Sequence, residues 1–204
     1  MTSERRHGLY AALRNPKLYE TVQRLMGADS RRRDFTQQFI RAQPGDRVLD
    51  IGCGPAHLLA HLPDVDYIGW EPNAAYVAKA RKTYGGRGTF HTGLFGPADA
   101  RSLDPVDIAI VSAVLHHMDD VQAKELFALL RRIVKPGGRV ITLDNVSIEH
   151  QNPIARLLIS LDRGRHVRSP AGYEELARGA FEHVDGTVVA QAFPPYTYFF
   201  MTAR

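Results

Sequence analysis

The hydrophobic and polar positions between residues 44 and 145 switch repeatedly between two patterns. Short apolar runs with the length of buried strands alternate with stretches in which apolar residues recur at helical spacing. Such alternation favours a parallel sheet with helices on both faces. The expected strands are 48–51, 67–70, 89–91, 106–111 and 139–143, and the expected helices are 56–62, 74–84 and 121–133.

The two ends of the chain depart from this alternation. Residues 3–42 predict two or three short helices, and residues 150–180 predict two helices that we expect to cap the carboxyl end of the sheet. The last two strands, 184–192 and 196–201, are joined by only three residues, so they must pair antiparallel. We therefore expect a single domain with a helical lid (1–43), a central core (44–145), cap helices (146–181) and terminal antiparallel strands (182–204).

Composition narrows the class of protein without identifying it. The chain has 204 residues, of which 44% are hydrophobic and 24% charged, as expected for one soluble globular domain. Cys53 is the only cysteine, so an internal disulfide is impossible and a reducing cytoplasm is the expected location. The N-terminus lacks the apolar run of a signal peptide, and no stretch approaches the ~20 apolar residues that span a bilayer. The net charge of +4 is small and dispersed, so neither nucleic acid nor membrane is the expected partner, and the oligomeric state stays open.

The turn that follows the first expected strand carries the main functional signal. Gly52 and Gly54 stand one residue apart directly after the buried run 48–51, and glycine lets a backbone approach a ligand closely. A dinucleotide site requires a third glycine at position 57, where His57 stands instead. Asp50, two residues before the first glycine, places a carboxylate at the strand tip. This carboxylate suits a cationic amino-acid end such as the methionyl ammonium of S-adenosylmethionine.

Glu71 ends the second expected strand, one strand after the glycine turn. Its carboxylate can accept two hydrogen bonds from a ribose diol. The same residue also fits an acid at a helix N-terminus, which the helix dipole favours. Its position beside the glycine turn favours the ribose interpretation, although nicotinamide enzymes place an acid similarly.

Segment 47–145 resembles the class I S-adenosylmethionine-dependent methyltransferases, most of all the small-molecule group called type 11 or type 12. The matching segments are Leu49–Gly54, Glu71, Val111–Asp120 and Leu130–Gly138. The resemblance implies an α/β, Rossmann-like, doubly wound seven-stranded sheet of order 3-2-1-4-5-7-6 with strand 7 antiparallel. It also implies S-adenosylmethionine as the cofactor, S-adenosylhomocysteine as its product, and a small molecule as the methyl acceptor.

The resemblance assigns cofactor contacts to the ends of the first four strands. Families of this kind often carry an acid after the third strand, but this chain has none before Asp99, so we assign the adenine contact to Gly93 and Leu94. If the N-terminal helices form a lid, Tyr19 and one arginine of 31–33 reach the cofactor as well. The expected cofactor-binding residues are Asp50, Gly52, Cys53, Gly54, Glu71, Pro72, Gly93, Leu94, Ser112, Ala113, Leu115 and Tyr19.

His116 and His117 are the candidate catalytic residues, because they follow the fourth strand, next to where the resemblance places the methyl group. Methyl transfer mainly requires the acceptor to be aligned ~3–3.5 Å from the methyl carbon. A histidine can orient the acceptor or take its proton, since imidazole titrates near neutrality. The alternative is that one histidine packs under the loop while the other is a spacer.

Three motifs that suggest other chemistry are set aside. His57 and His61 have zinc-ligand spacing but no evident third ligand. Asp144 resembles part of the magnesium turn of catechol-type methyltransferases, but the carboxylate that those enzymes carry after the fourth strand is replaced by Ser112-Ala113. Pro194-Pro195-Tyr196 resembles a motif of base-amino methyltransferases but stands between the terminal strands. No metal is therefore expected.

A basic cluster in the expected cap offers a place for an anionic acceptor. Arg163, Arg165 and Arg168 are candidate substrate-binding residues, because guanidinium groups pair with carboxylate or phosphate. The alternative is a surface turn in which one arginine caps a helix. The sequence as a whole favours methyl transfer to an oxygen or nitrogen of a small molecule. A non-catalytic cofactor-binding or adaptor protein and a nicotinamide-dependent oxidoreductase are the alternatives.

Overall fold

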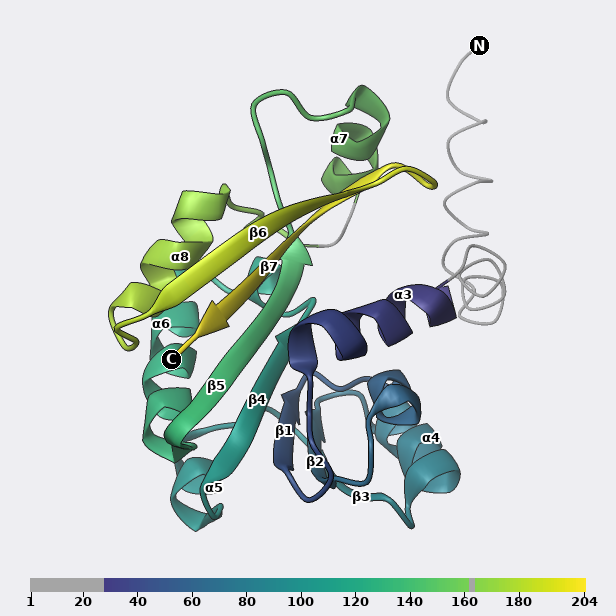
Figure 1. The fold of residues 1–204 in the computed structure, drawn as a ribbon, viewed down its shortest axis with the longest axis vertical. Helices are drawn as coiled ribbons and strands as arrows, with labels where there is room; N and C mark the ends of the chain where they lie inside the picture. The colour runs from purple at the N-terminus through teal and green to yellow at the C-terminus, as the bar shows by residue number, and fades with distance from the viewer. Residues whose placement is uncertain (1–27, 162–163) are drawn as a thin grey trace.

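The computed structural model describes residues 28–161 and 164–204, which form one seven-stranded sheet with helices on both faces (Figure 1). The strand order is β3-β2-β1-β4-β5-β7-β6, which confirms the order that the family resemblance implies. Strand β1 pairs in parallel with β2 and β4, whereas β7 is antiparallel to both β5 and β6. The strands are β1 (Arg47–Ile51), β2 (Asp66–Glu71), β3 (Gly88–Thr92), β4 (Val106–Ser112), β5 (Val134–Asn145), β6 (Val184–Gln191) and β7 (Tyr196–Ala203).

Strand β5 begins earlier than the pattern predicts. The sequence predicts a helix to residue 133 and a strand from residue 139, with Pro136-Gly137-Gly138 as a break between them, but the chain enters the sheet directly after Ile133. The pairing of β4 with β5 shifts register after Val106, so these residues lie in an irregular part of the strand. Gly137 has φ +80°, a backbone conformation that glycine adopts without strain.

The helices agree with the predicted pattern in the core and differ in two places. The predicted helix at 56–62 is a short 3₁₀ turn, and α5 between β3 and β4 has no counterpart in the predicted elements. The helical elements are α3 (Ala28–Phe35), the π-helical turn η1 (Thr36–Ile40), the 3₁₀ turns η2 (His57–His61) and η3 (Leu115–His117), α4 (Ala74–Tyr84), α5 (Pro97–Ser102), α6 (Asp120–Ile133), α7 (Pro153–Ser160) and α8 (Pro170–Arg178).

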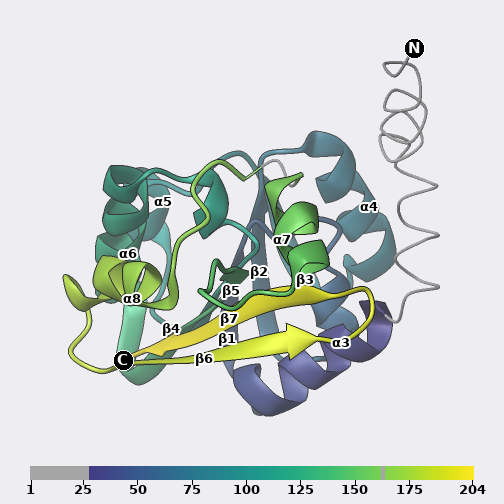
Figure 2. The same ribbon diagram turned by 90° about the horizontal axis from the view of Figure 1, so that it is seen from above.

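The two faces of the sheet carry separate hydrophobic cores, because successive residues of a strand point to opposite faces. Along β1, Val48 packs with α3 and α4, and Leu49 packs with α6 and α8. Figure 2 shows these helix pairs on either side of the strands. The buried parallel strands are therefore apolar on both faces, which explains the continuous apolar runs in the sequence.

The two helices expected as a cap occupy different places. Helix α7 packs against β7 and lies beyond the carboxyl end of β5 (Figure 1). Helix α8 packs against α6, β6 and β7, so it covers a face of the sheet. Only α7 therefore has the position that the sequence suggests for both.

Candidate functional site

A cavity with a volume of about 590 Å³ opens at the carboxyl ends of β1 and β4. Four of the predicted cofactor residues line it, namely Asp50, Gly52, Cys53 and Ser112. These residues are close in space because the carboxyl ends of neighbouring parallel strands meet at one edge of the sheet. The cavity therefore lies where ligands bind in doubly wound sheets.

Apart from the arginines of 31–33, the other walls of the cavity come from residues that the sequence did not connect with it. Helix α3 and the turn η1 contribute charged and aromatic side chains, and the hairpin of β6 and β7 contributes a mostly apolar wall on the far side. The rings of Phe39 and Phe200, one from each wall, stack with centroids 4.0 Å apart. The main additional lining residues are Arg31, Arg32, Phe35, Phe39, His57, Leu58, Leu143, Val189, Gln191, Tyr198 and Phe200.

The glycine turn has the backbone that its sequence predicts. Gly52 has φ +72° and Gly54 φ +55°, both in the left-handed region. A Cβ atom at Gly52 would collide with the side chain of Val114, so the turn also packs tightly against the β4–α6 loop. The backbone N–H groups of Gly52 and Cys53 donate to the carbonyl of Trp70 at 2.8 and 3.1 Å, which fixes the turn to β2.

Asp50 is a buried carboxyl group at the wall of the cavity, with 1% of its surface exposed. Burial, and to a smaller extent the charge of Glu71, raise its pKa to about 7, although the O–H of Tyr67 donates to Oδ2 at 2.6 Å and opposes the shift. A cation in the cavity would stabilise the ionised form. Burial first, and then the charges of Asp50 and Glu71, raise the pKa of the Cys53 thiol, so Cys53 is unsuited to act as a thiolate nucleophile.

Glu71 lies outside the cavity lining but is bonded to the glycine turn. Its Oε2 accepts from the N–H of Gly54 at 3.1 Å, and its Oε1 accepts from the N–H of Asn73 at 2.8 Å. The N–H of Gly93 donates to its carbonyl at 3.1 Å, which joins the end of β3 to the same place. Leu94 follows with 78% of its surface exposed, an apolar side chain that is open to a ligand. The region between the cavity and the end of β3 therefore contains Glu71, Gly93 and Leu94. Pro72 is exposed beside them.

The β4–α6 loop is divided between an exposed and a buried part. Ala113 and His117 are exposed, whereas Leu115 is fully buried in the core and 2% of His116 is exposed. The prediction that Leu115 contacts the cofactor is wrong for its side chain, which packs in the core with α6 and α8. Neither histidine lines the cavity.

His116 forms a buried pair with Asp144. Its Nδ1 lies 2.8 Å from Asp144 Oδ1, and its backbone N–H donates to the same oxygen at 3.1 Å. Burial raises the pKa of Asp144, and the hydrogen bond and charge of His116 oppose that rise. The ring of His117 lies against that of His116, with centroids 4.1 Å apart.

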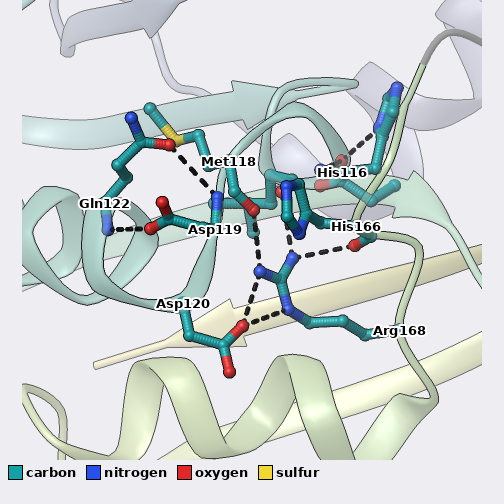
Figure 3. A network of polar contacts seen from close by, with 9 residues as sticks. His116, Met118, Asp119, Asp120, Gln122, His166 and Arg168 are labelled. Carbon is teal, nitrogen blue, oxygen red and sulfur yellow. Dashed lines mark hydrogen bonds and ion pairs between the residues drawn. The ribbon is translucent and has the colours of Figure 1, made fainter.

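Arg168 binds the β4–α6 loop and not the cavity, which corrects its assignment to the acceptor. Its Nη1 donates to the carbonyls of Leu115 (3.0 Å) and His166 (2.9 Å), and its Nη2 donates to that of Met118 at 2.7 Å. Its Nε and Nη2 also pair with Asp120 at 2.9 and 2.7 Å (Figure 3). All five N–H groups of this guanidinium are used, so none is left for an acceptor.

The structure describes only some of the remaining residues for which the sequence predicts a role in the site. Arg165 is exposed, outside the cavity lining. Tyr19 and Arg163 lie outside the described residues. Of the arginines considered for the cofactor carboxylate, Arg31 and Arg32 line the cavity, whereas Arg33 pairs with Asp29 at 3.7 Å.

This sheet order, with a glycine turn and a strand-end acid at one cavity, defines the class I methyltransferase fold. Residues 12–183 match the family described as "Methyltransferase domain", and the chain belongs to this family. An uncharacterised methyltransferase of Mycobacterium tuberculosis is 33% identical over 103 residues, and one of Mycobacterium bovis is 32% identical over 99 residues. Each match covers 48% of this chain and 38% of the relative, so well under half of the relatives' length is matched.

Solved structures of the same fold include several methyltransferases. The pyocyanin biosynthetic protein PhzM superposes with a TM-score of 0.69 at 17% identity, over 96% of this chain and 61% of that chain. Human N-acetylserotonin methyltransferase in complex with SAM superposes with a TM-score of 0.58 at 20% identity, over 78% and 47%. These likenesses establish the fold. Within residues 28–161 and 164–204, every helix is too short or too polar to cross a bilayer.

Proposed function

We propose that this methyltransferase takes its methyl group from S-adenosylmethionine and transfers it to an oxygen or nitrogen of a small molecule. The observation that carries the proposal is the position of Asp50, Gly52 and Ser112 on one cavity, with Glu71 bonded to the same turn. The family match supports the transfer of a methyl group, and the complex of a relative of the fold with SAM supports the cofactor.

The buried acid at the cavity suits the methionyl end of this cofactor. The Asp50 carboxyl is desolvated and its described partner is a neutral hydroxyl, so a ligand ammonium would pair with it in a low-dielectric environment. Each oxygen of Glu71 accepts one backbone hydrogen bond and has capacity for another, so it can also receive the ribose hydroxyls. The exposed face of Leu94 would then pack on the adenine.

The acceptor would occupy the part of the cavity beyond the glycine turn. The wall there is aromatic and aliphatic, with Phe39, Phe200 and Leu143 on its surface, and Arg31 and Arg32 add positive charge. Apolar and aromatic walls with few polar groups are typical of small-molecule sites. We infer an acceptor with a flat or apolar body, and an anionic group on it would match the arginines.

A proton acceptor is needed when the methylated group is a hydroxyl or a protonated amine. We propose His117 for this role because it is exposed at the sheet edge, with His116 and Asp144 as positioning residues behind it. Asp144 accepts from Nδ1 of His116 and so fixes the tautomer of that ring. A small-molecule enzyme of this kind also fits the reducing cytoplasm expected from the single cysteine.

Ligand titration followed by methyl transfer tests the function. Trp70 is the single tryptophan and directly precedes Glu71, so its fluorescence reports on the site. We expect saturable binding of S-adenosylhomocysteine and none of NADH at the same concentrations. Preferential binding of NADH would favour the oxidoreductase.

With S-adenosylmethionine labelled in its methyl group, a panel of phenols, aromatic acids and amines should yield a labelled product. The yield should fall at least tenfold in His117→Ala and stay within twofold in a control His150→Ala. Cofactor binding without transfer to any acceptor would favour the non-catalytic alternative.

A further inference from the structure

A second cavity, with a volume of about 640 Å³, lies at the opposite end of the sheet from the proposed cofactor site. It is lined by Asp46 just before β1, by Gly137 and Arg139 early in β5, and by Thr202 and Arg204 at the end of the antiparallel strand β7. These positions mark the amino edge of the parallel strands. The chemistry proposed at the carboxyl edge makes no use of this cavity.

Arginines dominate the charge of this second cavity. Three of them, Arg41, Arg139 and Arg204, line it together with one carboxylate, Asp46. Asp46 already accepts a hydrogen bond from the N–H of Gln43 at 2.7 Å. Burial lowers the pKa of Arg139, and the positive charges of Arg204 and Arg41 lower it further, although Asp46 and Asp107 oppose them. An anion between these guanidinium groups would offset the repulsion between their positive charges.

Arg41 and Arg139 also donate hydrogen bonds to backbone carbonyls, and these bonds place their other N–H groups at the cavity. Arg139 donates from Nη2 to the carbonyls of Ile40 (2.6 Å) and Arg41 (3.2 Å), and Arg41 donates from Nε to that of Gln38 at 2.8 Å. These bonds hold the guanidinium groups of Arg41 and Arg139 beside the cavity. Exposed Arg204 adds a third group of N–H donors.

We propose that this cavity, hereafter the arginine cavity, binds a small multivalent anion that carries two or three phosphate groups. Guanidinium groups bind phosphate oxygens in pairs, and three cations against one engaged carboxylate match an oligophosphate better than a single carboxylate. The volume also accommodates a nucleoside attached to the phosphates. Free oligophosphate and a nucleotide share this chemistry.

The arginine cavity is joined to the proposed cofactor cavity through η1. Gln38 and Phe39 line both cavities, and the ring of Phe39 stacks on Phe200 in the wall of the cofactor cavity. Turns with π-helical bonding are rare and often occur at functional sites. An anion that draws Arg139 away from the carbonyls of Ile40 and Arg41 would loosen the end of η1. Anion binding should therefore weaken cofactor binding, a coupling that rests on the proposed function.

Calorimetric titration with sodium tripolyphosphate, ATP and inorganic phosphate at constant ionic strength tests the site. We expect saturable binding of tripolyphosphate or ATP and at least tenfold weaker binding of phosphate. Equal affinities for tripolyphosphate and ATP would indicate that the phosphates alone are recognised, whereas tighter ATP would indicate a nucleotide. No saturable binding of either compound would overturn the proposal.

Matched variants distinguish specific binding in the arginine cavity from non-specific attraction of the anion to positive charge. Arg41 has φ +50°, so Arg41→Gly removes a guanidinium without backbone strain, and Arg204→Gln changes an exposed residue. The double variant should bind tripolyphosphate at least tenfold more weakly, while the exposed control Arg132→Ala stays within twofold. An equal loss in Arg132→Ala would show non-specific attraction and refute the site.

Two measurements test the coupling. Saturating tripolyphosphate should raise the Kd of S-adenosylhomocysteine at least threefold. Phe200→Leu, which removes the ring stacked on Phe39 and lies outside the lining of the arginine cavity, should abolish this effect while tripolyphosphate affinity stays within twofold. Hydrogen exchange of the backbone amides of residues 36–41 should become faster with the anion, whether or not the nucleoside binds. Unchanged exchange there would refute the coupling. Failure of S-adenosylhomocysteine to bind without the anion would refute only the proposed function.

Discussion

Two buried carboxyl groups stand at the same edge of the sheet, and their surroundings differ. Burial raises the pKa of both Asp50 at the end of β1 and Asp144 near the end of β5. Asp50 is bonded to the neutral hydroxyl of Tyr67 and borders a cavity, whereas Asp144 is bonded to His116. Asp50 could therefore pair with a cation bound in the cavity, whereas Asp144 is already paired with a histidine of the protein.

We call the side of the sheet edge with Asp50 and the cavity the open side, and the side with Asp144 and His116 the closed side. The closed side is covered by residues 164–168, in which the sequence predicts substrate-binding arginines. The N–H of His166 donates to the carbonyl of His116 at 3.0 Å, and a Cβ atom at Gly164 would collide with the ring of His116. Arg168 then binds three carbonyls and Asp120 (Figure 3). Similar residue types at one sheet edge thus line the proposed ligand site on one side and form a structural clamp on the other.

The largest expected effect is on the closed side. Arg168→Met should lower the free energy of unfolding by roughly 3 kcal/mol, because three part-buried carbonyls lose a charged donor. Urea unfolding measures this loss, with exposed Arg165→Met as the control, for which we expect a change within about 0.5 kcal/mol. The affinity for S-adenosylhomocysteine should stay within threefold. A loss below 1 kcal/mol, or one no larger than in the control, would refute the clamp.

On the open side, Asp50→Asn should weaken S-adenosylhomocysteine binding about thirtyfold, or ~2 kcal/mol, because the ammonium loses its charged partner. The same variant should be more stable than the wild type at pH 8 by roughly 1–4 kcal/mol, since ionised Asp50 is buried at a cost. The folded pKa of about 7 exceeds the ordinary 3.8, so this gain should shrink as pH falls from 7 to 4. Exposed Asp185→Asn is the matched control. Unaltered affinity in Asp50→Asn would separate Asp50 from the ligand.

Cofactor affinity should depend on pH through the same group. Asp50 binds a cation only when ionised, and its pKa of about 7 implies roughly tenfold weaker binding of S-adenosylhomocysteine at pH 6 than at pH 8. Titrations at four pH values measure the slope. Asp50→Asn should abolish it, whereas a slope retained in this variant would assign the titration to another group.

The smallest effect concerns the adenine end. Leu94→Ser should weaken S-adenosylhomocysteine binding about threefold, because less apolar surface is then available to cover the base. Stability should change by less than about 0.5 kcal/mol, since the side chain is 78% exposed. Binding and thermal unfolding of the same sample test both expectations. A large loss of stability with no change in affinity would place Leu94 in the fold and remove it from the site.

The strands and the glycine turn were predictable because both depend on local signals, whereas the sheet order came from the resemblance to class I methyltransferases. Apolar runs mark the strands, and Gly52 and Gly54 mark a turn whose positive φ angles the structure contains. The early start of β5 was missed because a proline and two glycines in an irregular strand look like a helix end. Helix α5 was missed because its six residues include no buried side chain to create a pattern.

The lining of the candidate site was predictable where a local motif or the family resemblance marks a residue, as at the glycine turn and at Ser112. Phe39 and Phe200 meet across the cavity from positions far apart in the chain, and no local pattern joins them. The burial of His116 and the full use of the Arg168 donors depend on how residues 164–168 fold onto the β4–α6 loop. Residue type suggested chemistry for both, and tertiary hydrogen bonding determined which of their atoms reach solvent.

A crystal structure of the complex with S-adenosylhomocysteine tests the central claim most directly. We predict the ligand's amino group in the cavity beside Asp50, its ribose on the carboxylate of Glu71 and its adenine against Leu94. Density for the nucleoside away from the glycine turn, or a site left empty at a saturating concentration, would contradict the account.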